Sequence, residues 1–214
     1  MHERLTINPL LADEDTLRRA VAVLKEGHVI IYPTDTLYGI GVDPGNEAAL
    51  QRVQRIKRRF EPKPLLLIAS SLSSAETVVR NFPPAALRLA KEFWPGPLTM
   101  ILPAIPTLSS FVTQGTGTVG LRIPSSTFCL QLTEHFDGPI TSTSANISGE
   151  RTPDTIDEIE SIFGDDVDLY LDAGPLPTSP PSTIVDVSGD FPRLVRQGVI
   201  SQERLHQVLP EIHA

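Results

Sequence analysis

The sequence predicts an α/β protein in which helices flank one mixed sheet, and three observations support this fold class. Patterns typical of amphipathic helices alternate along the chain with short apolar runs typical of buried strands. The composition shows no abrupt change that would mark a domain boundary. Hydrophobic residues make up 40% of the 214 residues, which is enough to bury a core. We therefore expect a single domain over residues 1–214.

The chain is predicted to open with a helix and a strand. Residues 13–27 begin with acidic residues, carry apolar residues at helical spacing and end in Gly27. Residues 28–33 (HVIIYP) have the composition of a short buried strand that Pro33 ends. The further predicted helices share a helical apolar period and cover residues 46–59, 72–81, 84–94, 128–136, 154–163 and 201–209. The further predicted strands are short apolar runs and cover residues 64–70, 98–104, 118–124, 139–144, 168–174, 182–188 and 193–198.

Composition and missing motifs exclude several classes of protein. A formal net charge of -8 argues against a protein that binds nucleic acid through its overall charge. The single cysteine, Cys129, excludes an internal disulfide and a cysteine-based zinc cluster, and its helical context predicts a buried structural thiol. The scattered histidines argue against a histidine metal site. The sequence contains no GxxxxGK[ST], HExxH or GxSxG motif, which removes Walker-type nucleotidases, zinc proteases and α/β-hydrolases.

No apolar run approaches the length needed to span a membrane. The charged, proline-interrupted N-terminus also differs from a secretory signal. Because the cysteine content is that of a protein from a reducing compartment, we expect a cytoplasmic protein with no membrane partner.

A polar loop is expected after the first strand, in YPTDTLYGIG at residues 32–41. Loops at strand ends are where open α/β sheets place ligands. The alternative is a simple turn built on the proline and a glycine, with threonines that cap it. A turn alone does not need four polar side chains, which favours a site. These side chains are Thr34, Asp35, Thr36 and Tyr38.

Positive charge gathers in QRVQRIKRRFEPKP at residues 51–64, the obvious place in an acidic chain for an anionic partner. Three arginines are interpreted as a solvated helix face. These are Arg52, Arg55 and Arg58. Lys57 and Arg59 differ because the helix there runs into a proline-containing loop, so their side chains can reach another segment. Arginine offers a planar fork to carboxylate or phosphate, and lysine offers a point charge.

The segment TSTSANISG at residues 141–149 combines hydroxyls, an amide and a glycine with almost no bulk. Small residues let the backbone approach a ligand, and Ser142, Ser144 and Asn146 offer hydrogen bonds without imposing a charge. This suits a polar ligand that already carries charge. The alternative is a polar turn in which Asn146 and Gly149 adopt left-handed conformations.

Other candidate side chains lie beside predicted strands. Thr118 and Arg122 belong to TGTVGLRIP, where strand alternation puts them on the face opposite the large apolar residues. Ser182 and Arg196 lie next to short strands near the end of the chain. The proline-rich segment 173–182 (AGPLPTSPPS) is either a linker or a surface loop beside a site.

Taken in order, these segments resemble the YrdC-like threonylcarbamoyl-AMP synthases. The motifs that carry the resemblance run from about residue 28 to residue 198: PTDTLYGIG, KRRFEPKPL, WPGPLT, VGLRIP, TSANISG, STIVDV and RQG. Each motif is modest, and the ordered set is specific. The family pairs Lys-x-Arg with Ser-x-Asn, which matches Lys57, Arg59, Ser144 and Asn146. This chain departs from the family pattern at Arg58 and Phe60, where the family often has Gly or Asn and then Pro.

The resemblance implies an open twisted sheet with flanking helices and a central concave cavity lined by positive charge. It implies the joining of L-threonine, bicarbonate and ATP into threonylcarbamoyl-AMP with release of pyrophosphate. The family pattern makes four residues catalytic: Lys57, Arg59, Ser144 and Asn146. It places L-threonine at Thr34, Arg122, Ser142 and Ser182. It places ATP, with Mg2+ held mainly through the phosphates, at Lys57, Arg59, Thr118, Ser144, Asn146 and Arg196.

The expected partners are the proteins that transfer the threonylcarbamoyl group to the tRNA adenosine beside the anticodon. A hypothesis from a different class is a non-catalytic RNA-binding module that uses the same concave basic surface. That module would bind RNA in a salt-sensitive way without threonine. Hydroxyls and asparagine outnumber aromatic residues in the candidate segments, which favours the enzyme, with weak tRNA affinity at most.

Overall fold

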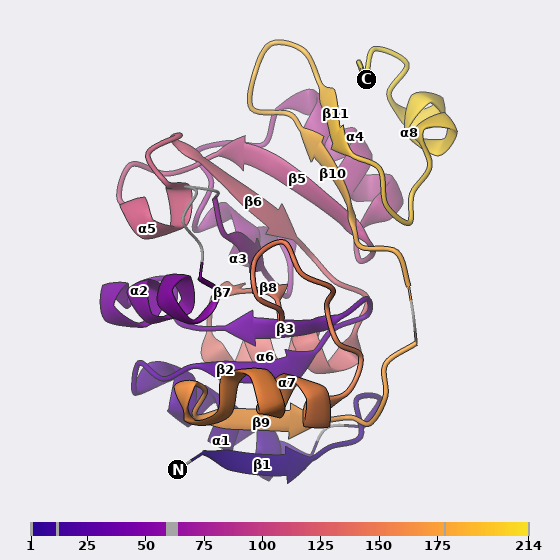
Figure 1. The fold of residues 1–214 in the computed structure, drawn as a ribbon. Coiled ribbons are helices and arrows are strands. Elements are labelled where there is room, and N and C mark those ends of the chain that lie inside the picture. Colours follow the sequence, from indigo (N-terminus) through magenta and orange to yellow (C-terminus); the bar gives the residue numbers. More distant parts are fainter. Residues whose placement is uncertain (1, 12, 59–63, 178, 214) are drawn as a thin grey trace.

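A computed structural model describes residues 2–11, 13–58, 64–177 and 179–213. Strands in this part of the chain form two sheets, and the helices pack around them (Figure 1). The helices are α1 (Glu14–Lys25), α2 (Glu47–Ile56), α3 (Leu72–Glu76), α4 (Pro84–Phe93), α5 (Ser110–Thr113), α6 (Thr127–Phe136), α7 (Ile156–Phe163), the 3-10 helix η1 (Gly164–Asp166) and α8 (Gln202–Val208). The strands are β1 (Glu3–Thr6), β2 (Ile30–Pro33), β3 (Tyr38–Gly41), β4 (Leu66–Ile68), β5 (Leu98–Pro103), β6 (Thr118–Arg122), β7 (Ile140–Thr141), β8 (Thr143–Ser144), β9 (Leu169–Asp172), β10 (Thr183–Asp186) and β11 (Arg193–Arg196).

Both sheets contain parallel and antiparallel pairs. The five-stranded sheet has the order β1-β9-β2-β3-β8, and the six-stranded sheet has the order β11-β10-β5-β6-β4-β7. In the first sheet β9 is parallel to β1 and β2, while β3 is antiparallel to β2 and β8. In the second, β10 is parallel to β5, and β5 is antiparallel to β6. The predicted α/β class with mixed pairing is confirmed, and the strands divide between two sheets rather than one.

The two sheets meet at the segment that carries β7 and β8. Strand β7 pairs with β4 of the six-stranded sheet, and β8 pairs with β3 of the five-stranded sheet. Only Ser142 separates these two short strands, and its N–H donates to the carbonyl of Leu66 at 2.8 Å. The polar segment singled out in the sequence therefore lies at the junction of the sheets.

Helices α1 and α6 lie beside each other on one face of the five-stranded sheet, and α7 lies on the opposite face (Figure 1). Buried apolar residues of α1 and α6, among them Leu24 and Phe128, pack with β2 and β9 in one cluster. Side-chain caps start the helices where the sequence changes from polar to periodic. Asp13 accepts the N–H of Thr16 at 2.8 Å before α1, and Asn46 accepts that of Ala49 at 3.0 Å before α2.

Four elements were not predicted, among them the 3-10 helix η1, and one helix is shorter than expected. Strand β3 occupies part of residues 32–41, which the sequence analysis interprets as a loop; β1 and α5 were also missed. Helix α3 ends at Glu76 rather than near residue 81. The glycines of β3 explain its atypical composition, because a Cβ on Gly41 would lie 2.7 Å from the ring of Tyr32, and one on Gly39 would lie 3.1 Å from the Ser142 hydroxyl.

Cys129 lies on the inner side of α6 as a free, fully buried thiol, as expected. Among the helices that the structure describes, none has the length and apolar character that crossing a bilayer requires.

Candidate active site

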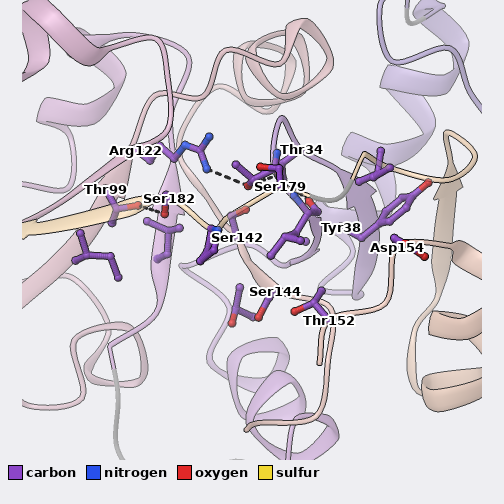
Figure 2. A pocket seen from close by; sticks show the side chains of 18 of the residues that line it. Thr34, Tyr38, Thr99, Arg122, Ser142, Ser144, Thr152, Asp154, Ser179 and Ser182 are labelled. Atoms are coloured by element: carbon purple, nitrogen blue, oxygen red, sulfur yellow. Dashed lines mark hydrogen bonds between the residues drawn. The ribbon is translucent and has the colours of Figure 1, made fainter. Parts of the chain in front are cut away.

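A cavity of about 510 Å³ lies where the two sheets meet, within the usual size range of ligand pockets. Its walls come from both sheets and from two loops, one at residues 151–154 and the other at residues 176–177 and 179–182. Figure 2 shows Arg122, Thr99 and Ser182 toward one end and Tyr38, Thr152 and Asp154 toward the other. The sequence-predicted residues that line this cavity are Thr34, Arg122, Ser142, Ser144, Ser182 and Arg196. The side chains predicted to hold L-threonine therefore share one cavity.

Arg122 is almost fully buried in β6, with 4% of its surface exposed. Its Nε donates to the carbonyl of Gly96 at 2.8 Å, and its Nη1 donates to the hydroxyl of Thr36 at 3.3 Å. Its Nη2 lies 2.6 Å from Asp35 Oδ1 as an ion pair, although the geometry is not that of a directed hydrogen bond. The guanidinium is thus both charge-paired and fixed in orientation at the wall of the cavity.

The turn between β2 and β3 is closed by the hydroxyl of Thr34. This hydroxyl donates to the carbonyl of Leu37 at 2.7 Å and accepts the N–H groups of Thr36 and Leu37, each at 3.1 Å. The alternative of a threonine-capped turn therefore holds for this hydroxyl, while Thr34 also lines the cavity.

Ser182 and Arg196 form one wall of the cavity. The Ser182 hydroxyl lies 2.9 Å from that of Thr99, and Arg196 Nη2 donates to the Ser182 carbonyl at 2.9 Å. Arg196 is exposed as a residue, and partial burial of its guanidinium lowers the pKa of that group. Within the described part of the chain it has no carboxylate partner, whereas Arg122 has one. Arg196 is therefore suited to bind an anion from the cavity.

Lys57 reaches across to the small-residue segment, as the sequence predicts. Its ammonium donates to the carbonyls of Ser144 at 2.5 Å and Asn146 at 3.0 Å, and it lies 3.4 Å from Asn146 Oδ1. The Ser144 hydroxyl donates to Asn146 Oδ1 at 2.5 Å. Lys57 and Asn146 lie behind Ser144 rather than in the cavity wall, with 4% and 7% of their surface exposed. Lys57 thus fixes the backbone that carries Ser144.

The remaining sequence-based predictions have mixed outcomes. Arg59 lies outside the described residues. Thr118 does not line the cavity, and its hydroxyl instead lies 2.8 Å from that of Thr116. Gly149 has a φ of 89°, as expected for a turn, but Asn146 is not left-handed. The expected solvated helix face is confirmed for Arg55, whereas Arg58 is exposed but lies beyond the end of α2 with a φ of 49°.

Arg52 departs from that expectation, because its Nη1 pairs with Asp168 Oδ2 at 2.7 Å and the side chain is only 26% exposed. The pair ties α2 to the residue just before β9. The charge of Arg52 is therefore used within the fold rather than offered to a partner.

Of the two alternatives for the proline-rich segment 173–182, the structure favours the surface loop, because residues 173–177 and 179–182 form a loop beside the cavity. Its residues Leu176, Pro177, Ser179 and Pro181 line the cavity. The N–H of Leu176 donates to the carbonyl of Asp154 at 2.9 Å, which links this loop to the other loop of the wall.

Sequence reasoning missed several wall residues: Thr99, Thr152, Asp154 and Ser179. Thr99 belongs to a predicted strand, where its sequence pattern does not distinguish it from any other strand threonine. Thr152 and Asp154 lie three and five residues after TSANISG, so their only signal was proximity to that motif.

Comparisons with known proteins agree with this geometry. Residues 22–198 match the Sua5/YciO/YrdC family model, which carries the description "Telomere recombination". A threonylcarbamoyl-AMP synthase from Vibrio vulnificus is 34% identical over 184 residues, which is 85% of this chain and 98% of that protein. The structure of Pyrococcus abyssi Sua5 complexed with L-threonine aligns with a TM-score of 0.92 and 32% identity, over 98% of this chain and 62% of that one.

Escherichia coli YciO aligns with a TM-score of 0.88 and 29% identity, over 96% of this chain and all of that one. The fold, the family match and these relatives define the class. The chain belongs to the Sua5/YciO/YrdC family, as the resemblance implied. It spans about three fifths of the Pyrococcus abyssi protein.

Proposed function

We propose that the protein is a threonylcarbamoyl-AMP synthase, which joins L-threonine, bicarbonate and ATP into threonylcarbamoyl-AMP and releases pyrophosphate. The observation that carries this proposal is the cavity at the junction of the two sheets, which is lined by three arginines and several hydroxyls from separate segments. The names of the relatives support it, and so does the L-threonine complex of the Pyrococcus abyssi protein.

L-Threonine is proposed to bind at the end of the cavity that carries Arg122. The guanidinium offers an N–H donor to the carboxylate, and the hydroxyls of Ser142 and Ser182 are available to the substrate side chain. The turn at Thr34 lines the same region. This arrangement leaves the amine free to add to bicarbonate-derived CO2 and form a carbamate.

The carbamate oxygen then attacks the α-phosphorus of ATP. The bond between the α-phosphorus and the bridging oxygen breaks, and pyrophosphate leaves with the electron pair. This step brings several anionic groups together, so fixed positive charge is the main catalytic requirement. We propose that Arg196, which lines the cavity, supplies this charge, and that Lys57 and Asn146 support Ser144 in the cavity wall. Arg59 and Thr118 stay predictions for the ATP site.

The described residues include no group of three or more His, Cys, Asp or Glu side chains that could hold a metal ion. We propose that Mg2+ enters on the phosphates of ATP, where it would neutralise their charge. The protein's own residues would orient the nucleotide.

A carbamate that gains a proton loses CO2, so the site must limit access of water. We propose that the loops at residues 151–154, 176–177 and 179–182, which line the cavity, provide this cover. The carbamate is then proposed to leave only as the adenylate, which separate transfer proteins would carry to tRNA in the cytoplasm.

The test is pyrophosphate release from Mg-ATP with L-threonine and bicarbonate each present or omitted. We expect release only when both are present. L-Valine lacks the hydroxyl and leaves polar partners unpaired, so we expect at least about 100-fold lower kcat/KM with it. Release that ignores threonine, or equal use of valine, would contradict the proposal. RNA affinity without any release would favour the RNA-binding module instead.

A further inference from the structure

The guanidinium of Arg122 is held on three sides before any ligand arrives. Its contacts are the carbonyl of Gly96, the hydroxyl of Thr36 and the carboxylate of Asp35. A guanidinium carries five N–H groups, and because Nη2 is buried, the second N–H of Nη1 is the donor that these contacts leave for a ligand in the cavity. Of the three partners, Asp35 alone carries a charge and can oppose the positive charge of Arg122.

The carboxylate of Asp35 is itself held in place by Ser125. Its Oδ2 accepts the hydroxyl of Ser125 at 2.7 Å and the N–H of Ser125 at 3.1 Å. Ser125 lies between β6 and α6 and is exposed, while the Asp35 side chain is only 14% exposed. Both carboxylate oxygens are therefore engaged, one by Ser125 and the other by Arg122. This geometry leaves Asp35 unsuited to act as a general base on the substrate amine.

The chain of contacts joins two segments that are distant in sequence. The turn between β2 and β3 supplies Asp35, strand β6 supplies Arg122, and the residue that follows shortly after β6 supplies Ser125. A buried arginine without a charged partner would cost free energy, and its guanidinium would hydrogen-bond to other acceptors instead. A locked partner instead fixes one orientation, and a fixed orientation lowers the entropy that binding must overcome.

We propose that Asp35 is a positioning residue, which Ser125 holds in place so that Arg122 presents its remaining donor to the carboxylate of L-threonine. This inference rests on the proposed function, because it takes L-threonine as the ligand of Arg122. Asp35 acts through Arg122 and does not touch the substrate. Its effect therefore falls on threonine affinity rather than on the chemical step.

The experiment compares wild type with Asp35→Asn, Asp35→Glu, Ser125→Ala and Asp168→Asn. Asp168→Asn is the matched control, because it removes the carboxylate of another arginine pair that lies outside the cavity. Calorimetry measures the Kd of L-threonine and of L-threoninamide, which lacks the carboxylate. Pyrophosphate release gives the KM of threonine and kcat separately, and thermal unfolding reports on the fold.

We expect Asp35→Asn to raise the Kd and KM of threonine about 10- to 100-fold, with kcat at saturating threonine within about threefold of wild type. Its preference for threonine over threoninamide should shrink by a similar factor. Ser125→Ala removes one of the two contacts that hold Asp35, so we expect a smaller increase of about threefold. Asp35→Glu should restore part of the affinity, and Asp168→Asn should leave it unchanged.

If Asp35→Asn does not fold, Ser125→Ala tests the proposal instead, because it leaves the ion pair of Asp35 and Arg122 in place. Unchanged threonine affinity in folded Asp35→Asn, or in Ser125→Ala alone when the first variant does not fold, would overturn the proposal. An equal loss of affinity for threonine and for threoninamide would also overturn the proposal. If the wild type itself fails to bind threonine, the proposed function fails, and that result is separate because it appears before any variant is compared.

Discussion

At the scale of single residues, two of the three arginines that line the cavity, Arg122 and Arg196, are in opposite electrostatic situations, while the third, Arg151, is exposed and pairs with Glu158. Arg122 has a carboxylate partner at 2.6 Å, whereas the contacts of Arg196 among the described residues are to the carbonyl and hydroxyl of Ser182. A paired arginine serves mainly to orient a ligand, and an unpaired, partly buried one is free to compensate an anion. This difference between Arg122 and Arg196 fits the proposed reaction, in which one substrate carries a single carboxylate and the other carries a polyphosphate.

Replacement of Arg196 by Met should therefore impair the nucleotide step. We expect kcat to fall about 100- to 1,000-fold, by analogy with the loss of one donor from an oxyanion site. The matched control is Arg193→Met, which removes an exposed arginine from the same strand, and it should change kcat less than about twofold. Steady-state pyrophosphate release measures both. Similar rates for the two variants would rule out the role given to Arg196.

Lys57 has a structural role that can be measured apart from activity. Replacement by Met would leave the carbonyls of Ser144 and Asn146 without their ammonium donor. We expect the free energy of unfolding to fall by about 1–3 kcal/mol, the usual cost of unsatisfied buried groups. Urea unfolding provides the measurement. Arg55→Met, an exposed change on the same helix, should stay within about 0.5 kcal/mol of wild type. A fully stable Lys57→Met protein would contradict this account.

At the scale of elements, β1 is joined to the molecule by parallel pairing with β9 and by side-chain contacts at its start. His2 lies 2.6 Å from Glu160 of α7 and 2.8 Å from Asp165 of η1. Hydrogen bonds to Glu160 and then Asp165 raise the pKa of His2 above its ordinary value of 6.5. The attachment of β1 therefore depends on pH.

Because this pKa is higher in the folded state, protonated His2 stabilises the fold fully below pH 6.5. The contribution is lost as pH rises through the raised folded-state pKa. We expect wild type to exceed His2→Gln in unfolding free energy at pH 6 and the difference to shrink toward about pH 9. Urea unfolding at a series of pH values tests this. A difference that grows with pH has the wrong sign for this account.

The thiol of Cys129, a residue of α6, is buried where this helix packs against the core. Burial raises the pKa of this thiol to about 12, so it stays protonated and inaccessible near neutral pH. We expect no reaction with a thiol reagent at about pH 8 in native buffer and reaction of one thiol per chain in denaturant. Absorbance of the released chromophore measures it. Rapid labelling of the native protein would show that α6 opens, and this packing would then be wrong.

At the scale of the whole molecule, local patterns predicted most elements but not their division between two sheets. Helices such as α1 and strands such as β5 have clear periodicity or composition, so their residues identify them. Strand β3 lacks such a pattern because it contains Gly39 and Gly41. A Cβ at these positions would lie too close to Ser142 or Tyr32, which belong to other segments. Which strands pair depends on such long-range contacts, and a local pattern does not contain them.

The same limit applies to the site. Ser144, Asn146 and Lys57 were predicted from motifs, and the structure brings them together. The partnership of Arg122 with Asp35 could not be foreseen, because it depends on how β6 lies against the turn after β2. Thr118 is the opposite case. It was predicted for the ATP site and belongs to a strand next to a motif, but it does not line the cavity.

The central claim is that the cavity between the sheets makes threonylcarbamoyl-AMP. The most direct measurement is the incorporation of 14C from labelled bicarbonate into a nucleotide product, in reactions with Mg-ATP and with or without L-threonine. We predict a labelled adenylate whose mass equals threonylcarbamoyl-AMP, formed only with threonine and lost in Arg196→Met. Folded, threonine-binding protein that forms no labelled adenylate would contradict the claim.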